Sequence, residues 1–311
     1  MSAVFRDRIA LAVLVSLLIA GWAAYADEAP AKEPGKPRWT PFVRGGYVHQ
    51  FETDIDDGGE FDSDRLFLQA GASYSIAPGR RVSLSVGYGR DNYGFSGNKG
   101  FAGDSPWKNI NQFRFSAPVF WAVDKKWSLY AIPTVRFAGE TDTDLNDSGT
   151  GGVLAGFSYR FSDTLTLGPG IGVISQLEDS ASIFPIVIVD WKITERLRLE
   201  TGGGLGATRG PGLTLSYKVN NAWNVALGGR YESYDFRLND SGPAPDGVGR
   251  DRSFPLFVSA TYSQGRKLQV SALAGAEIGG ELRLQDSKGK TIAKEDYDTA
   301  PFLGFSFSYR F

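Results

Sequence analysis

The sequence contains no cysteine and only one histidine, His49, among its 311 residues. Without cysteine the chain forms no disulfides, so its stability has another source. It also offers no N-terminal cysteine for lipid attachment. After residue 26 no uninterrupted apolar stretch is long enough for a membrane helix, which needs roughly 20 residues. The net charge is close to neutral at −2. There is also no basic stripe that would indicate a nucleic-acid partner.

The first 26 residues predict a secretory signal peptide. Arg6 and Arg8 form a positive start, residues 9–22 form an apolar core, and residues 24–26 (Ala-Tyr-Ala) fit the small-residue cleavage pattern. Cleavage there would leave a mature chain that begins at Asp27. The alternative is an uncleaved membrane anchor, but the apolar core is short for a span.

The last ten residues alternate strictly between large apolar side chains and small or polar ones. Counted back from the end, the apolar positions are Phe311, Tyr309, Phe307, Phe305 and Leu303. Because side chains in a β-strand alternate between two faces, one face of this strand is apolar and the other polar. Such a strand at the end of a chain makes sense if its apolar face meets lipid and its edge closes onto the first strand.

This pattern resembles the closing strand of Gram-negative outer-membrane β-barrel proteins, either porin-like or uncharacterised, and the resemblance covers residues 38–311. It implies export through the secretory pathway to the cell outer membrane. The implied partners are outer-membrane lipid, lipopolysaccharide and the barrel-assembly machinery, whose signal would be Phe305, Phe307, Tyr309 and Phe311. The motif indicates location but not function, because pores, enzymes, adhesins and assembly factors all carry it.

Residues 27–37 are Pro-rich and charged, which predicts a short disordered periplasmic lead-in before the barrel. From Arg38 onward, alternating segments recur at about the length that a tilted strand needs to cross a bilayer. Six short turns are expected within residues 74–82, 121–127, 159–165, 191–197, 217–223 and 262–268. Seven longer connections are expected at 54–64, 96–108, 141–150, 178–180, 204–210, 239–251 and 285–298.

Short periplasmic turns that alternate with longer outer loops are typical of transmembrane barrels. The sequence therefore predicts an all-β, antiparallel, up-and-down transmembrane β-barrel of 14 strands, or of 12 if the hairpin around 200–215 fails. A soluble β-sandwich is the alternative. The long strands, the regular alternation of turns with loops and the terminal Phe311 all count against it. Four tryptophans beside the short turns predict an aromatic belt: Trp121, Trp127, Trp191 and Trp223.

Charged residues of both signs occupy predicted inward positions, among glycine, serine and threonine. The candidates for pore lining are Arg44, Arg114, Arg136, Asp190, Arg198, Glu200, Arg230, Glu232 and Glu277. They would set the selectivity of a hydrated pore. Alternatively, they hold the wall rigid, or a loop such as 96–108 or 239–251 folds in and plugs the lumen.

An apolar sector is also predicted on the inner face, which is unusual for a water-filled channel. It consists of Phe120, Tyr130, Ile132, Phe184 and Ile186. This sector would be either a path for an apolar substrate or the docking site of an inserted segment.

Two predicted outer loops are acidic, and oxygen-rich clusters suit hard cations. The weak metal candidates are Asp54, Asp56, Asp142 and Asp144. The run from Asp142 to Asn146 begins like a calcium loop, but Asp147 stands where glycine is required and Val153 where glutamate is required. We therefore expect solvated loops that attract cations loosely.

The function predicted from the sequence is a monomeric channel for passive passage of small solutes, without a cofactor. One alternative is a non-conducting structural or surface-binding barrel with a plugged lumen. Another is a lipid-modifying hydrolase with His49 as base, oriented by Asp54 or Asp56. A lone histidine on a strand is more often incidental, so the chain is not expected to be an enzyme.

Overall fold

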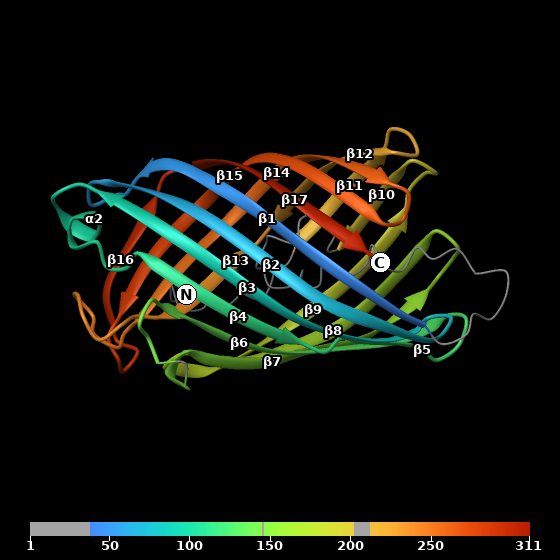
Figure 1. The fold of residues 1–311 in the computed structure, drawn as a ribbon, viewed down its shortest axis with the longest axis horizontal. Coiled ribbons are helices and arrows are strands. Elements are labelled where there is room, and N and C mark those ends of the chain that lie inside the picture. Colours follow the sequence, from blue (N-terminus) through green and yellow to red (C-terminus); the bar gives the residue numbers. More distant parts are fainter. Residues whose placement is uncertain (1–37, 145, 202–211) are drawn as a thin grey trace, which may run out of the picture.

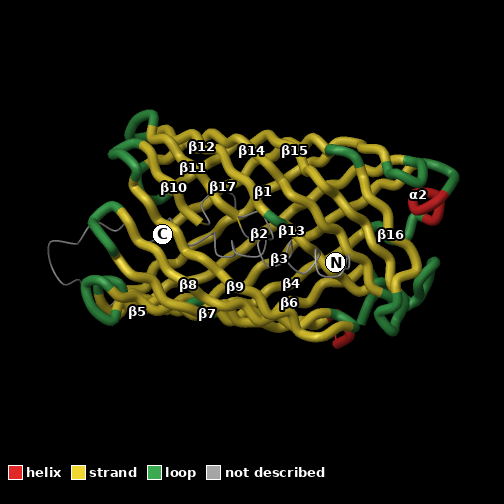
Figure 2. Tube along the Cα trace, turned by 180° about the vertical axis from the view of Figure 1, so that it is seen from behind, coloured by secondary structure: helices red, strands yellow, loops and turns green. Residues whose placement is uncertain are grey.

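The computed structural model describes residues 38–144, 146–201 and 212–311, which form one closed β-barrel (Figures 1 and 2). Strand β1 (Arg38–Asp54) pairs with β2 (Glu60–Ala77) on one side and with β17 (Ala300–Arg310) on the other, which closes the sheet. The predicted all-β antiparallel barrel is thus confirmed. The predicted signal peptide and lead-in lie outside the described residues.

The remaining strands follow in chain order around the wall. They are β3 (Arg80–Ser96), β4 (Asn109–Ser116), β5 (Val119–Ala122), β6 (Trp127–Glu140), β7 (Gly149–Arg160), β8 (Leu165–Gln176), β9 (Asp179–Lys192), β10 (Leu197–Thr201), β11 (Gly212–Lys218), β12 (Trp223–Arg230), β13 (Glu232–Arg237), β14 (Val248–Gln264), β15 (Leu268–Gln285) and β16 (Thr291–Tyr297). Three strands are interrupted: β4/β5, β12/β13 and β16/β17 each run along the same neighbouring strand. The described segments therefore make fourteen strands, as predicted. Twelve is wrong, because β10 and β11 pair with each other.

The interruption between β4 and β5 has a local cause at Pro118, which has no backbone N–H to give to a sheet ladder. Its carbonyl still accepts a hydrogen bond from the Ser83 N–H at 2.8 Å, and the Ala117 N–H donates to the Pro133 carbonyl at 3.0 Å. The wall therefore stays closed across the break.

The six short turns lie where the sequence predicted them, and four of them use the same device. Asp124, Ser162, Thr194 and Asn220 each accept hydrogen bonds from the backbone N–H groups two and three residues later. At Asp124 the backbone N–H groups of Trp127 and Lys126 donate to the carboxylate and lower its pKa. This recurring side-chain acceptor accounts for the weak internal repeat in the sequence.

The longer connections differ most from the prediction in two places. Strand β2 already begins at Glu60, so Asp62 and Asp64 belong to the wall and not to the first loop. The predicted loop 285–298 contains strand β16. Elsewhere, loop 97–108 carries the short helix α2 (Gly100–Asp104) and the next loop carries the 3₁₀ turn η2 (Asn146–Ser148). The predicted loop 204–210 lies outside the described residues.

Apolar side chains cover the outer face of the wall, including Leu66, Leu84, Val86, Leu227 and Val258, each at least 46% exposed. Exposed apolar surface of this extent fits lipid and not water. The predicted tryptophans lie exposed at the short-turn end, where Trp127 packs against Tyr159 and Trp223 against Tyr262. The fold is that of an outer-membrane barrel, with an aromatic belt at the end that carries the short turns.

The seam of the barrel lies between its first strand, β1, and its last strand, β17. The seam joins β1 to β17 from Phe42 opposite Arg310 to Gln50 opposite Phe302, and the Phe311 N–H donates to the Pro41 carbonyl at 3.1 Å. Phe305 and Phe311 face outward and are more than half exposed.

None of the helices in the described part of the chain has the length and apolar character needed to cross a membrane.

Candidate functional site in the barrel lumen

Three of the candidate pore-lining arginines lie on one row across the inner face of β1 to β6. Arg44 stands opposite Gln69, and along the same row Arg114 stands directly opposite Arg136. The Arg44 Nε donates to the Gln69 Oε1 at 2.5 Å, and the Arg136 guanidinium lies 5.5 Å from the centre of the Tyr234 ring. Like charges placed directly opposite each other destabilise a sheet. The guanidinium groups of Arg114 and Arg136 lie next to each other on the inner face of β4 and β6.

Three other candidates form a local ion group near the short-turn end. The Arg198 guanidinium bonds both carboxylate oxygens of Asp190, at 2.8 and 2.9 Å, and lies 3.4 Å from Glu200. All three residues sit on the neighbouring strands β9 and β10. Because charges of both signs bond one another within one stretch of wall, they fit the prediction of charges that stiffen the barrel. Arg230 is buried against the Phe257 ring, at 5.3 Å.

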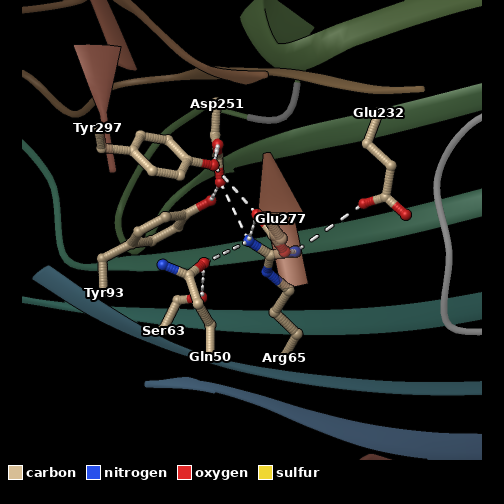
Figure 3. A network of polar contacts seen from close by, with 8 residues as sticks. All are labelled: Gln50, Ser63, Arg65, Tyr93, Glu232, Asp251, Glu277 and Tyr297. Carbon is tan, nitrogen blue, oxygen red and sulfur yellow. Dashed lines mark hydrogen bonds and ion pairs between the residues drawn. The ribbon is translucent and has the colours of Figure 1, made fainter. Parts of the chain in front are cut away.

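A buried network joins β2 to β13, β14 and β15 through Arg65, as Figure 3 shows. The Arg65 guanidinium from β2 lies 2.6 Å from Glu277 of β15, 3.3 Å from Asp251 of β14 and 3.9 Å from Glu232 of β13. These four side chains are at most 11% exposed. The lumen is therefore tied across at this level by charge-assisted hydrogen bonds.

Neutral groups complete this network. The Gln50 Oε1 accepts from Arg65 at 3.0 Å and from the Ser63 hydroxyl at 3.1 Å. The Tyr93 hydroxyl donates to Asp251 at 2.9 Å, and the Tyr297 hydroxyl donates to Glu277 at 3.0 Å. Asp251 and Glu277 thus each have a hydrogen-bond donor in addition to the guanidinium, as buried charges require.

Sequence reasoning named Glu232 and Glu277 but missed Arg65 and Asp251. The sequence did contain a signal for Arg65. Gln69 faces the lumen, and the alternation of side chains along β2 places Arg65 on the same inner face. Arg65 stood directly after the predicted loop 54–64 and Asp251 stood inside the predicted loop 239–251, so neither was counted among the inward positions.

We expect Arg65→Ala to lower the free energy of unfolding by about 3–5 kcal/mol, because it leaves buried carboxylates without their shared cation. Urea unfolding of the detergent-purified barrel, followed by tryptophan fluorescence, measures the loss. Arg90→Ala is the matched control, because Arg90 is an exposed arginine on β3. Equal midpoints for both variants would show that the network contributes nothing to stability.

An apolar cluster closes the outer end of the lumen above the network. It packs Phe61 and Ile110 from one side of the wall against Phe236 and Leu282 from the other, and each of these four side chains is fully buried. Trp107, next to α2, lies in the same cluster and contacts the Phe236 ring at 5.1 Å. Phe101 and Ala102 of loop 96–108 and Ala244 of loop 239–251 also belong to this cluster. Both loops therefore fold inward, as in the alternative that a loop plugs the lumen.

One side chain links this closed mouth to the surrounding loops. The Arg237 guanidinium at the end of β13 donates to the Asp147 carbonyl at 2.9 Å, the Asp246 carbonyl at 2.7 Å and the Glu178 carboxylate at 2.5 Å. Arg237 also pairs through its backbone with Gly139 of β6 in a single parallel bridge. Three outer connections are thus held by one cation.

The predicted apolar sector is present on the inner face. Tyr130 and Ile132 of β6 pack with Phe184 and Ile186 of β9, and Phe120 packs against them. A second inner cluster lies on the other wall, where Val48, Phe257, Leu273 and Phe302 meet. The inner surface therefore has apolar sectors on both sides.

His49 does not face the lumen. Its Nδ1 lies 2.8 Å from the Asp64 Oδ1 on the outer face, and the Tyr47 hydroxyl donates to the same carboxylate. Asp64, and not Asp54 or Asp56, thus orients this histidine. On the other side its strand neighbour is Leu303, and none of its hydrogen bonds within the described residues involves a serine or threonine.

The weak metal candidates do not form a site in the described part of the chain. Nowhere in it do three or more histidine, cysteine, aspartate or glutamate side chains gather so that they could hold a metal ion. This includes Asp54, Asp56, Asp142 and Asp144.

The model of a family described as a domain of unknown function, DUF6268, matches residues 78–310. A search of curated protein sequences found no match. The outer membrane channel COG4313 from Pseudomonas putida F1 has a similar structure, with 12% identity and a TM-score of 0.50 over 92% of this chain and 100% of that one. A Pseudomonas aeruginosa FadL homologue has 12% identity and a TM-score of 0.49, over 96% of each chain.

Proposed function

The chain belongs to the DUF6268 family, and on that premise we propose that it is an outer-membrane channel for passive passage of small solutes, closed at its outer mouth in this conformation. The channel would consist of one chain, since a single chain closes the barrel. Passage would require the apolar cluster around Trp107 to separate from the wall.

The observation that carries this proposal is the composition of the inner wall below the closed mouth. Small hydroxyl side chains face inward there and bond one another across strands: Ser73 with Ser83 at 2.8 Å, Ser116 with Thr134 at 3.2 Å, and Thr261 with Ser271 at 2.8 Å. In barrels of about eight strands side chains fill the interior, whereas larger barrels leave room for a channel. Small polar groups that lie along the wall suit a passage instead.

The arginine row supports the same proposal. Arg44, Arg114 and Arg136 lie on β1, β4 and β6, whereas Glu232, Asp251 and Glu277 lie on β13, β14 and β15. Rings and rows of charge set the selectivity of pores. The fold is also shared with a protein that is itself an outer membrane channel.

Planar bilayer recordings with the purified full chain test the proposal. We expect rare, brief openings, since the mouth is closed, and a higher open fraction when a variant weakens the closure. The closed mouth also favours a second candidate, a non-conducting barrel whose outer loops do the work. A folded barrel that stays silent with and without the closure would establish that second candidate.

We also propose that Phe305, Phe307, Tyr309 and Phe311 form the assembly signal. Its support is that Phe305 and Phe311 stand exposed on the outer face of the seam strand, where an assembly factor can reach them. Phe311→Ala is expected to lower the amount of folded barrel in the outer membrane several-fold while leaving refolding in detergent unchanged. Heat-modifiable gel mobility of membrane fractions measures this, and Phe161→Ala serves as the exposed aromatic control. Equal amounts of folded barrel for both variants would contradict it.

A further inference from the structure

A cluster of cations lies on the outer face of the barrel near its outer end. Arg252 of β14, Arg283 of β15 and Lys294 of β16 all bond the carboxylate of Glu281, with the Arg283 contact at 2.7 Å and the Lys294 contact at 3.0 Å. Glu281 is only 2% exposed, whereas the three cations are 22–47% exposed. One covered carboxylate is thus shared by three accessible positive groups.

The strand register places these cations side by side. Arg283 stands directly opposite Lys294 on one side and opposite Arg250 on the other. Like charges in direct opposition destabilise a sheet unless a counter-charge lies between them. Arg250 has its own partner, since it bonds both carboxylate oxygens of Asp235 at 2.6 and 2.7 Å.

Other acids near this face leave the cluster positive. Asp296 stands opposite Glu281 and is exposed. The negative charge of Asp179 attracts Arg250. Apart from Arg250, which has Asp235 and Asp179 beside it, the three cations Arg252, Arg283 and Lys294 exceed Glu281 and Asp296 by one positive charge. The uncovered guanidinium and ammonium groups can accept an anion that brings further acceptor oxygens.

The position of the cluster identifies the kind of anion. On β14 the outward positions run from Val258 and Leu256 through Phe254 to Arg252, so the surface changes from apolar to charged at that point. On β15 the same change follows Ile278. The apolar band of an outer-membrane barrel is about 25 Å tall, and lipid headgroups lie at its edge. The cations thus stand directly above the surface that acyl chains cover.

We propose that Arg252, Arg283 and Lys294 bind the phosphate group of an anionic lipid in the outer leaflet. Guanidinium groups match phosphate oxygens with paired hydrogen bonds, and an ammonium adds a point charge. The acyl chains of the same lipid would lie on Leu256, Val258 and Ile278, all exposed. The ligand class is therefore a phosphorylated lipid whose headgroup and chains are recognised together, and the proposal does not depend on conduction.

Binding of a diphosphorylated glycolipid to the detergent-purified full chain, measured by native mass spectrometry, tests the proposal. We expect Arg283→Gln/Lys294→Gln to weaken binding about tenfold or more, since each lost charge-assisted bond contributes more than a neutral one. Arg90→Gln, an exposed outward arginine away from the cluster, should bind like the wild type. Unchanged binding by the double variant would overturn the proposal.

Two further measurements separate the site from general charge effects and from misfolding. Glu281→Gln keeps all three cations and removes their internal acid, so lipid binding should become several-fold tighter; weaker or equal binding contradicts the proposal. Inorganic phosphate and the dephosphorylated glycolipid should each bind much more weakly than the intact lipid, because each lacks half of the recognised surface. If either binds as tightly as the intact lipid, the site does not recognise a phosphorylated lipid.

Discussion

Arg237→Ala is expected to raise the open fraction of the barrel in planar bilayers by about a hundredfold. The side chain donates to Asp147, Asp246 and Glu178, and hydrogen bonds that involve a charged group contribute about 1.5–3 kcal/mol each. The loss of about 3 kcal/mol from the closed state alone shifts an open–closed equilibrium by about two powers of ten. The wall itself should stay intact, because Arg237 lies at the very end of β13.

Arg196→Ala is the control for this experiment, since Arg196 is an exposed arginine in a short turn at the opposite end of the barrel. Its recordings should match those of the wild type. Heat-modifiable gel mobility confirms that both variants are folded. If Arg237→Ala is folded and opens no more often than the wild type, Arg237 does not hold a gate. If deletion of residues 239–247 is silent as well, the barrel is a non-conducting scaffold.

The closed mouth explains why the sequence alone left channel and plug undecided. Side-chain alternation has a period of two, so it assigns Val82, Leu84 and Val86 to lipid and Ser83 and Ser85 to the lumen without knowledge of the loops. The sequence of turns and loops set the strand count, and the alternation of the last strand predicted that it closes onto the first. Local patterning fixes the wall because every wall residue is defined by its immediate neighbours along the chain.

Contacts across the lumen have no such local signature. Arg65 meets Glu277 from 212 residues away, and no spacing rule connects the two. Trp107 was one more aromatic in a loop, although its side chain is buried in the cluster that closes the mouth. Even the strand β16 was overlooked, because its Lys294, Glu295 and Asp296 read as a charged loop. These features arise from tertiary packing, which sequence periodicity does not record.

Arg114→Glu is expected to turn the selectivity of the open barrel toward cations by about tenfold in permeability ratio. The substitution changes the inner row by two units of charge, and at about 4 Å in a protein-like medium one unit is worth about 4 kcal/mol. It should also be well tolerated, because the new carboxylate stands directly opposite Arg136 and replaces a like-charge pair by an opposite-charge pair. The reversal potential in a salt gradient, recorded in the Arg237→Ala background, measures the ratio.

Arg90→Glu in the same background is the matched control, because it makes the same charge change on the adjacent strand but on the outer face. Its reversal potential should stay that of the background variant. A shift in both variants would assign the effect to the surface charge of the whole barrel. A shift in neither would mean that ions pass without meeting the arginine row, and Arg44, Arg114 and Arg136 would then be structural. Only a shift confined to Arg114→Glu places the conducting path along the inner wall of β4 and β6.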